Sequence, residues 1–319
     1  MTNRTTNGEQ KAKAETPTTP DFSRYKVCDS FQIPSIDSAV GADSPKENHR
    51  LSRRKLEEID IALSQRDKEV LHAIQRHRYL MTRQIQRLQF TDAANPSAAL
   101  RAASRNLKKL KELGLITNLS RRIGGVRAGS ASLIWHTTHA GERLLRLHDY
   151  KPYPSKRFFE PSPYFLAHTL AVAEISIQIA EVCKETNLEL SALQPEPDCW
   201  RVYSERGKHV SLKPDLYATI NSKEYEDRYF LEIDLDTESP AKIIEKCERY
   251  HKYYHSGLEQ KENGIFPLTV WIVPTEKRKE HLSSHIRTAF SKQPRLFAVI
   301  TDDELERLIR DGGDGSMLC

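Results

Sequence analysis

Little in this sequence points to covalent or metal cross-links, or to a membrane. The five cysteines are scattered and odd in number, and none form a C-x-x-C pair. This spacing argues against the disulfide framework of a small secreted protein and against a zinc knuckle, and it favours a reducing compartment. The sequence also has no run of about 18 apolar residues and no segment typical of a signal peptide. We therefore expect a cytoplasmic protein with no membrane partner.

The 319 residues are enough for two domains, each with its own core. Residues 1–50 are rich in Thr, Pro, Lys, Ser and Asp without an apolar period, which predicts a disordered tail. Four prolines within residues 151–163 predict a linker, and the glycine-rich end over 312–319 is expected to be flexible. We expect one domain over residues 51–150 and a second over residues 164–311.

The first predicted domain begins with three helices. After a charged, helix-compatible segment, Ser64 and Asp67 resemble a capping box that opens a helix. Thr82 can cap a second helix, and Asn95-Pro96 begins a third whose apolar residues follow the 3.6-residue period. Two short apolar strands follow, one on each side of a basic loop that contains glycines. This order predicts a winged helix-turn-helix.

The third helix and the basic loop concentrate positive charge. Between residues 96 and 128, eight lysines and arginines stand against Glu112 alone, so the net charge of +7 exceeds the +5 of the whole chain. Such a patch on a helix that fits the major groove predicts salt-dependent binding to double-stranded DNA. A merely solvated face and a protein-docking winged helix are the alternatives. The residues expected to contact DNA are Arg101, Arg105, Lys108, Lys109, Arg121, Arg122 and Arg127.

One more helix is expected after the strand pair. Thr138 and Gly141 precede the apolar residues Leu144, Leu145 and Leu147, a pattern typical of the last helix of a winged-helix module. Such a helix can cap the core of the domain or pair with a second copy of the chain. We favour the first role and keep a homodimer as the alternative.

Carboxylates concentrate on one face of a predicted strand in the second domain. In the segment Y-F-L-E-I-D-L-D-T, over residues 229–237, alternation places Glu232, Asp234 and Asp236 on the same face. Asp215 begins the preceding strand and joins them if the two strands form a hairpin. Hard oxygen ligands at this density suit Mg²⁺ or Mn²⁺. A solvated edge strand with its polar face outward is the alternative.

Two helices beside this strand carry further candidates. One begins near Ser239-Pro240, and its Lys246 lies next to the apolar stripe, from where it can reach the carboxylates. On the helix expected over residues 164–184, His168 falls on the buried face, where a hydrogen-bonded core histidine is the commoner role. Glu174 lies about 120° around that helix from His168, so the two can hardly face one cation.

Apolar strands at 268–273 and 296–300, separated by a helix, predict that the second domain has a sheet covered on both faces. The fold class expected for the chain is therefore α/β, or α+β overall. It combines an N-terminal winged helix-turn-helix with a mixed β-sheet flanked by helices.

The motif of the second domain resembles the PD-(D/E)XK nuclease core. Pro-Asp is followed by Glu-x-Asp at the end of an apolar strand and by a lysine that has migrated onto the next helix. More narrowly, L-K-P-D, F-L-E-I-D-x-x-T-E-S-P and a K-x-x-x-Y helix behind a winged helix are similar to the replication-relaxation family of plasmids and integrative elements. The similarity spans residues 64–275. Asp236 stands where the family leads us to expect glycine.

The resemblance implies a protein that binds origin DNA and nicks it as a metal-dependent endonuclease or relaxase. Asp215, Glu232 and the main-chain carbonyl of Ile233 would hold Mg²⁺ or Mn²⁺, and Lys246 would orient a water molecule. Asp234 occupies the lysine position of the nuclease triplet, either as a further metal ligand or as a sign that the ordinary hydrolytic geometry is lost.

The same resemblance places the first core helix beside the active site. His168 is therefore a candidate catalytic residue, and Glu174 is a candidate metal ligand. No tyrosine accompanies an H-x-H histidine motif, which argues against a conventional tyrosine relaxase. The alternative to an enzyme is a catalytically inactive origin-binding accessory factor or a transcription regulator.

Overall fold

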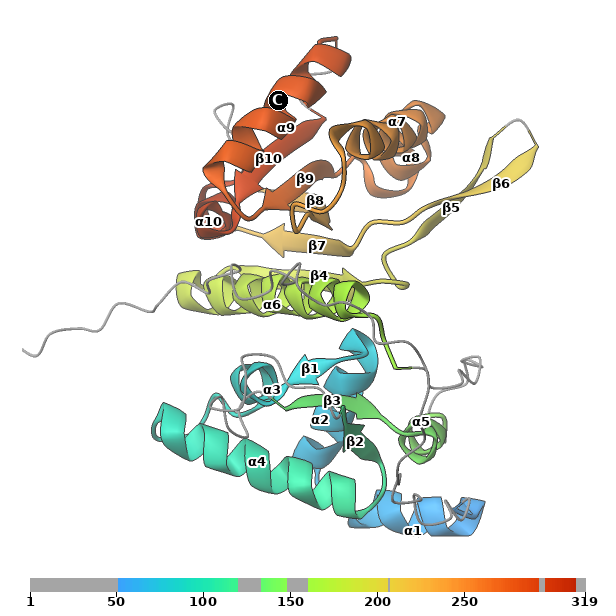
Figure 1. Cartoon of the computed structure of the whole chain (residues 1–319), viewed down its shortest axis with the longest axis vertical. Helices are drawn as coiled ribbons and strands as arrows, with labels where there is room; N and C mark the ends of the chain where they lie inside the picture. The colour runs from blue at the N-terminus through green and yellow to red at the C-terminus, as the bar shows by residue number, and fades with distance from the viewer. Residues whose placement is uncertain (1–50, 120–132, 148–159, 206, 293–295, 314–319) are drawn as a thin grey trace, which may run out of the picture.

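A computed structural model describes residues 51–119, 133–147, 160–205, 207–292 and 296–313. It confirms a mixed fold of helices and sheets, arranged as two units with the long helix α6 (Pro163–Thr186) between them (Figure 1). The predicted tail, most of the predicted linker and the basic loop that carries Arg121, Arg122 and Arg127 lie outside the described residues.

The first unit has five helices and a small antiparallel sheet in its described part. The sheet has the strand order β1-β3-β2. The elements are α1 (Arg53–Ala62), α2 (Gln65–His77), β1 (Leu80–Met81), α3 (Thr82–Gln89), α4 (Pro96–Glu112), β2 (Ile116–Asn118), β3 (Ile134–Thr137) and α5 (His139–Leu145). Apart from the short strand β1 between α2 and α3, the helices and strands follow one another in the order expected from the sequence.

Local capping explains where the helices of this unit begin. The capping box of Ser64 and Asp67 is present at α2, and the Asn95 side chain accepts a hydrogen bond from the Ala98 backbone at 2.8 Å at α4. The prediction that Thr82 caps α3 is wrong, because Met81 is the N-cap and Thr82 is the first helical residue. The Thr82 hydroxyl instead accepts a hydrogen bond from the Trp135 indole at 2.9 Å, which ties α3 to β3.

The second unit is built on a five-stranded sheet with the order β10-β9-β8-β7-β4. β8, β9 and β10 are parallel, whereas β7 pairs antiparallel with both β4 and β8. The strands are β4 (Glu189–Pro195), β7 (Leu216–Asn221), β8 (Glu226–Ile233), β9 (Leu268–Val273) and β10 (Phe297–Thr301). The hairpin that would bring Asp215 to the carboxylate strand is therefore present.

Helices cover both faces of this sheet, as the apolar strands predict. On one face, α6 and α10 (Leu305–Asp311), which follows the 3₁₀ turn η3 (Asp302–Glu304), share a core with β7–β10. On the other face, α7 (Pro240–Ser256) and α9 (Glu276–Ala289) form a second core, with α8 (Leu258–Asn263) packed beside α7. The side chains of β8 alternate between the two cores, with Tyr229, Leu231 and Ile233 in the first and Phe230 in the second.

Two further strands leave the sheet as a ribbon. β5 (Arg201–Glu205) and β6 (Lys208–Leu212) pair only with each other among the described strands, and they project from the side of the second unit (Figure 1).

Helix α6 contributes to the cores of both units. Val172, Ile175 and Ile179 pack in the core of the second unit, while Ala173 packs in that of the first. Within the described part of the chain, α6 alone is long and apolar enough to cross a membrane, but 67% of its apolar window is buried in the protein. This burial is consistent with a core helix of a soluble protein.

Candidate functional site

The β7–β8 hairpin brings two predicted site residues together at one end of the sheet. Leu216 of β7 pairs with Leu231 of β8. Asp215 immediately precedes Leu216 and Glu232 immediately follows Leu231, so the two acidic residues lie beside each other. Both carboxyl groups are largely withdrawn from solvent, with side-chain exposures of 13% and 2%. Two carboxylates that share one enclosed place repel each other unless positive charge accompanies them.

His168 supplies positive charge to Asp215. Its Nε2 lies 3.2 Å from Asp215 Oδ2, and the same oxygen accepts a hydrogen bond from the Ile233 backbone N–H at 2.8 Å. Burial alone would lower the pKa of His168, but the Asp215 carboxylate raises it to about 9. Burial likewise opposes the charge on Asp215, and the histidine outweighs it and lowers the pKa of this carboxyl. The pair is therefore an imidazolium and a carboxylate at neutral pH.

Lys246 and Tyr250 of α7 hold the second carboxyl group. The Tyr250 hydroxyl donates to Glu232 Oε1 at 2.6 Å, and Lys246 Nζ lies 3.4 Å from Oε2. Burial and the nearby charge of Asp215 raise the pKa of Glu232 to about 8. Lys246 also lies 3.1 Å from Glu238, and although burial disfavours its charge, Glu232 raises the pKa of its ammonium group.

The sequence predicts the reach of Lys246 but not the hydrogen bond of Tyr250. The Tyr250 ring also packs against Phe230, at a centroid distance of 5.7 Å. The signal for a polar role is the K-x-x-x-Y spacing, because residues four apart lie on the same face of a helix. Both side chains therefore reach the same carboxyl group.

Asp234 turns toward α9 and not toward this pair. Its Oδ2 lies 2.7 Å from Nε of Arg278, and Arg278 Nη2 donates to the Glu238 carbonyl at 2.6 Å. Both charged side chains are buried, with exposures of 0% and 8%. Asp234 is thus occupied by an ion pair that ties the end of β8 to α9. Sequence reasoning missed Arg278, because no pattern links it to a carboxylate 44 residues away.

Backbone geometry accounts for the glycine expected at residue 236. Asp236 has a φ of 60°, in the left-handed region that glycine adopts most readily and that aspartate tolerates better than most residues. Its backbone N–H donates to Asp234 Oδ1 at 3.1 Å, and its carboxylate lies 3.2 Å from Arg278. These contacts hold the turn in the required shape without glycine.

Glu174 does not lie with the other candidates. Its carboxylate faces α3 of the first unit, where Gln84 donates to Oε2 at 3.1 Å and Arg87 forms an ion pair with Oε1. The angle of about 120° from His168 directs it away from Asp215. The structure therefore does not place Glu174 in a metal-binding group.

The chemistry of Asp215 and Glu232 fits a magnesium-like ion. In the described part of the chain, no group of three or more His, Cys, Asp or Glu residues is arranged to hold a metal. Mg²⁺ does not require such a cage, since it keeps several waters and commonly binds through one or two carboxylates together with substrate phosphates. Two adjacent oxygen ligands therefore suit Mg²⁺ or Mn²⁺ better than zinc.

The predicted DNA-contacting residues of α4 divide into two groups. Arg101, Arg105 and Lys108 are exposed on the helix, which lies on the side of the first unit away from α6 (Figure 1). Lys109, by contrast, is bound to Asp67, whose carboxylate has an exposure of only 3%. Asn106 donates to the same carboxylate at 2.7 Å. Lys109 therefore holds α4 against the start of α2.

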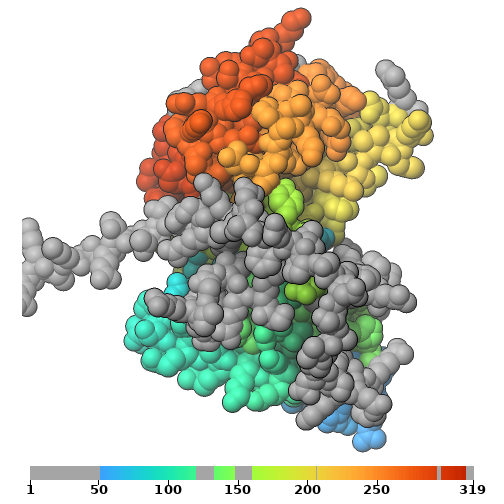
Figure 2. Space-filling view, in the orientation of Figure 1, coloured from blue at the N-terminus to red at the C-terminus, as the bar shows by residue number. Residues whose placement is uncertain are grey.

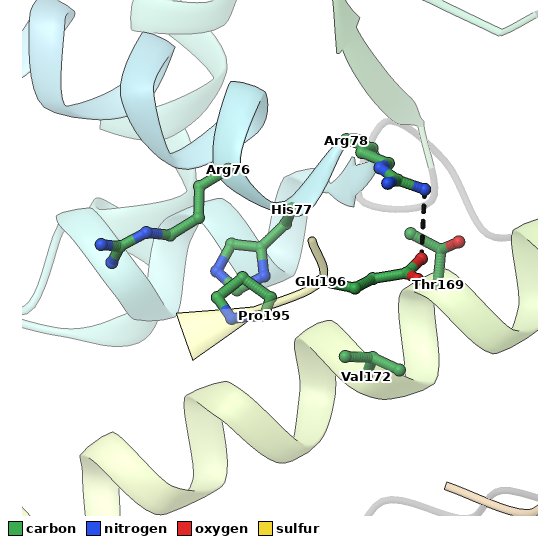
Figure 3. Close-up of a pocket in the computed structure, with 7 residues that line it drawn as sticks. All are labelled: Arg76, His77, Arg78, Thr169, Val172, Pro195 and Glu196. Carbon is green, nitrogen blue, oxygen red and sulfur yellow. Dashed lines mark hydrogen bonds and ion pairs between the residues drawn. The ribbon is translucent and has the colours of Figure 1, made fainter. Parts of the chain in front are cut away.

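A small cleft between the two units contains none of the predicted site residues (Figure 3). Arg78 Nη1 crosses it to Glu196 Oε1 at 3.1 Å, joining the loop after α2 to the end of β4. His77 on its wall is buried, and burial together with Arg76 lowers its pKa to about 4. The contacts across this cleft connect the two units.

A comparison with protein-family models matches residues 71–269 to a family described as replication-relaxation. The matched span is more than half of the chain and includes α4, the β7–β8 hairpin and Lys246. Among curated proteins, no sequence matches the chain.

Proposed function

Because the chain belongs to the replication-relaxation family, which associates it with replication of plasmids and mobile elements, we propose that it binds origin DNA and nicks it. In this proposal the first unit is a winged helix that binds double-stranded DNA through α4, and the second unit is a nuclease related to the PD-(D/E)XK enzymes. The observation that carries the proposal is the enclosed cluster of Asp215, Glu232 and Lys246 at the end of the β7–β8 hairpin.

The roles of the residues follow from their charges. Asp215 and Glu232 would hold Mg²⁺ or Mn²⁺, which when bound supplies a Lewis acid that polarises the scissile phosphate. Lys246 keeps its positive charge beside Glu232 and is placed to stabilise negative charge that develops on the phosphate. His168, whose pKa the Asp215 carboxylate raises to about 9 against the effect of burial, is a candidate proton donor to the leaving oxygen.

One observation favours a second function. The carboxylates of Asp215, Glu232 and Asp234 are each accompanied by a cation of the protein, namely His168, Lys246 and Arg278. A cluster neutralised in this way is stable without a metal and could serve only to fix the fold. The chain would then be an origin-binding accessory factor or a transcription regulator.

The experiment that separates these functions uses supercoiled plasmid DNA carrying the replication origin of the protein's own element. The purified full-length chain is incubated with it in Mg²⁺, Mn²⁺ or EDTA. Metal-dependent conversion to open circles supports the nuclease, and the EDTA reaction is the control for contaminating nicks that need no metal. Binding of the DNA without nicking in either metal supports the accessory factor.

Metal binding is expected to depend on pH through Glu232. A proton competes with the metal for this carboxyl group, whose pKa is raised to about 8, so Mn²⁺ affinity should fall as the pH drops below that value. The expected decrease is about tenfold per pH unit for one displaced proton. Isothermal titration calorimetry with Mn²⁺ at a series of pH values measures it. Affinity that is constant across this range would contradict the assignment of Glu232 as a ligand.

Two neighbouring basic residues of α4 are expected to give different results. Arg105 is exposed, so Arg105→Ala should weaken DNA binding and reduce the slope of log affinity against log salt by about one. Lys109→Ala should mainly lower stability, because it leaves Asp67 buried without its cation. Fluorescence anisotropy with labelled duplex DNA and thermal melting measure the two effects. Equal salt slopes for Arg105→Ala and wild type would contradict the DNA-binding role of α4.

A further inference from the structure

The β5–β6 ribbon is an arm whose base adjoins the candidate site. β6 ends at Leu212, and Asp215 follows three residues later. The strands extend from this base away from the body of the second unit (Figure 1), and the ribbon lies at the edge of that unit in the space-filling view (Figure 2). Whatever binds along the ribbon is therefore held close to Asp215 and Glu232.

The base of the ribbon is fixed to the core of the second unit. Arg201 donates through Nε to Glu259, which is fully buried, at 3.1 Å, and through Nη1 to the Cys199 carbonyl at 2.9 Å. Its guanidinium group also lies 4.7 Å from the centre of the Tyr217 ring. The Cys199 thiol in turn donates to the Pro214 carbonyl at 2.9 Å, which joins the segment that enters the ribbon to the segment that leaves it. These contacts set the direction in which the ribbon projects.

The two faces of the ribbon differ in character. On the inner face, Tyr203 is buried and contacts Tyr253 of α7 at a ring-centroid distance of 5.1 Å. On the outer face, Val202 pairs with Ser211, and Ser204 pairs with His209. All four outer residues are exposed, and Val202 has 68% of its surface accessible. The outer face is therefore open to a partner.

The charge of the described ribbon favours a polyanion. Lys208 and Lys213 are exposed, and Lys213 is held 4.4 Å above the Trp200 ring. The acidic residue Glu205 lies on the inner face, 3.9 Å from Lys252 of α7. Lys208 pairs with Glu205 in the strand register and so shares the inner face with it. The outer face therefore carries no carboxylate among its described residues, and Lys213 at its base gives it a positive character.

We propose that the outer face of the β5–β6 ribbon enters the major groove of double-stranded DNA beside the candidate nicking site. This inference rests on the proposed function, since it takes the same DNA to be the substrate. The major groove is about 12 Å wide and admits a two-stranded β-ribbon. Ser204, Ser211 and His209 present hydrogen-bonding groups to base edges, and Val202 presents an apolar surface to thymine methyl groups. Lys213 contacts a flanking phosphate.

The test compares Lys213→Ala with Lys223→Ala in the full-length chain. Lys223 is also exposed, but it lies in the β7–β8 turn, at the opposite end of the hairpin from Asp215. Binding to a random-sequence duplex is measured by anisotropy over a range of salt concentrations. Lys213→Ala is expected to reduce the salt slope by about one, and Lys223→Ala is expected to leave it unchanged. Equal slopes for the two variants would overturn the proposal.

A footprint on origin DNA provides the second measurement. Val202→Ala combined with His209→Ala should remove protection from one stretch of the duplex and leave the stretch covered by α4 intact. An unchanged footprint, or loss of self-association in place of DNA protection, would show that the ribbon has another partner. Arg105→Ala tests the first unit separately, so failure of the ribbon can be distinguished from failure of DNA binding as a whole.

Discussion

Asp215→Asn is expected to reduce metal-dependent nicking of supercoiled DNA by about a thousandfold, because a metal's Lewis-acid contribution amounts to several kcal/mol. Asparagine keeps an oxygen that can accept the Ile233 N–H, so the backbone contact at 2.8 Å can survive. What is lost is the negative charge that would hold the metal and that now pairs with His168. Initial rates of open-circle formation in Mn²⁺ measure the effect.

Glu224→Gln is the matched control for this variant. Glu224 is an exposed carboxylate in the turn of the same hairpin, at the end away from the site, and its replacement should leave the rate unchanged. Thermal melting of both variants distinguishes loss of chemistry from loss of fold. If Asp215→Asn nicks DNA as fast as Glu224→Gln, the hairpin cluster is not the active site, and the accessory-factor function gains support.

Arg87→Ala is expected to lower the free energy of unfolding by about 3 kcal/mol, the largest stability effect that we predict for a single side chain. It leaves Glu174, with an exposure of 5%, without its cation in the contact between α3 and α6. Removing one partner of a buried pair typically costs about 3–5 kcal/mol, and the 29% exposure of Arg87 places this case at the lower end. Urea denaturation followed by circular dichroism measures the loss.

Two further variants show whether that loss arises from the unpaired charge. Arg83→Ala removes an exposed arginine from the same helix and should change stability by no more than about 0.5 kcal/mol. Replacing both Arg87 and Glu174 by methionine should recover much of the stability, since an apolar pair leaves no buried charge. A similar stability for Arg87→Ala and Arg83→Ala would contradict the role assigned to this contact.

Local patterns in the sequence predicted much of this fold. The capping box of Ser64 and Asp67 and the helix start at Asn95-Pro96 each depend on residues within one helical turn. The sequence alone therefore shows where these two helices begin. The alternation of β8 similarly fixed which residues share a face, and it placed Glu232 beside Asp215 once the hairpin was assumed. β1 escaped prediction because two residues are too few to show a period.

Partners that come from distant segments could not be predicted in this way. The metal role expected for Asp234 did not anticipate Arg278, and that expected for Glu174 did not anticipate Arg87. The sequence indicates on which face of its strand or helix each carboxylate lies. The cation that lies opposite that face is determined by how whole helices pack. The chemistry of a charged residue was therefore predictable only where its partners lay on the same hairpin or the helix that follows it.

The position of α6 between two cores has a consequence for how such proteins can diversify. Gln84 of the first unit donates to Glu174 and to the Leu170 carbonyl of the second, and Arg87 forms an ion pair with Glu174. The contact surface between α3 and α6 therefore depends on residues from both units. Recombination within the segment between the units would join an α3 to an α6 with which it had not co-evolved. Lineages should therefore inherit the two units as one block.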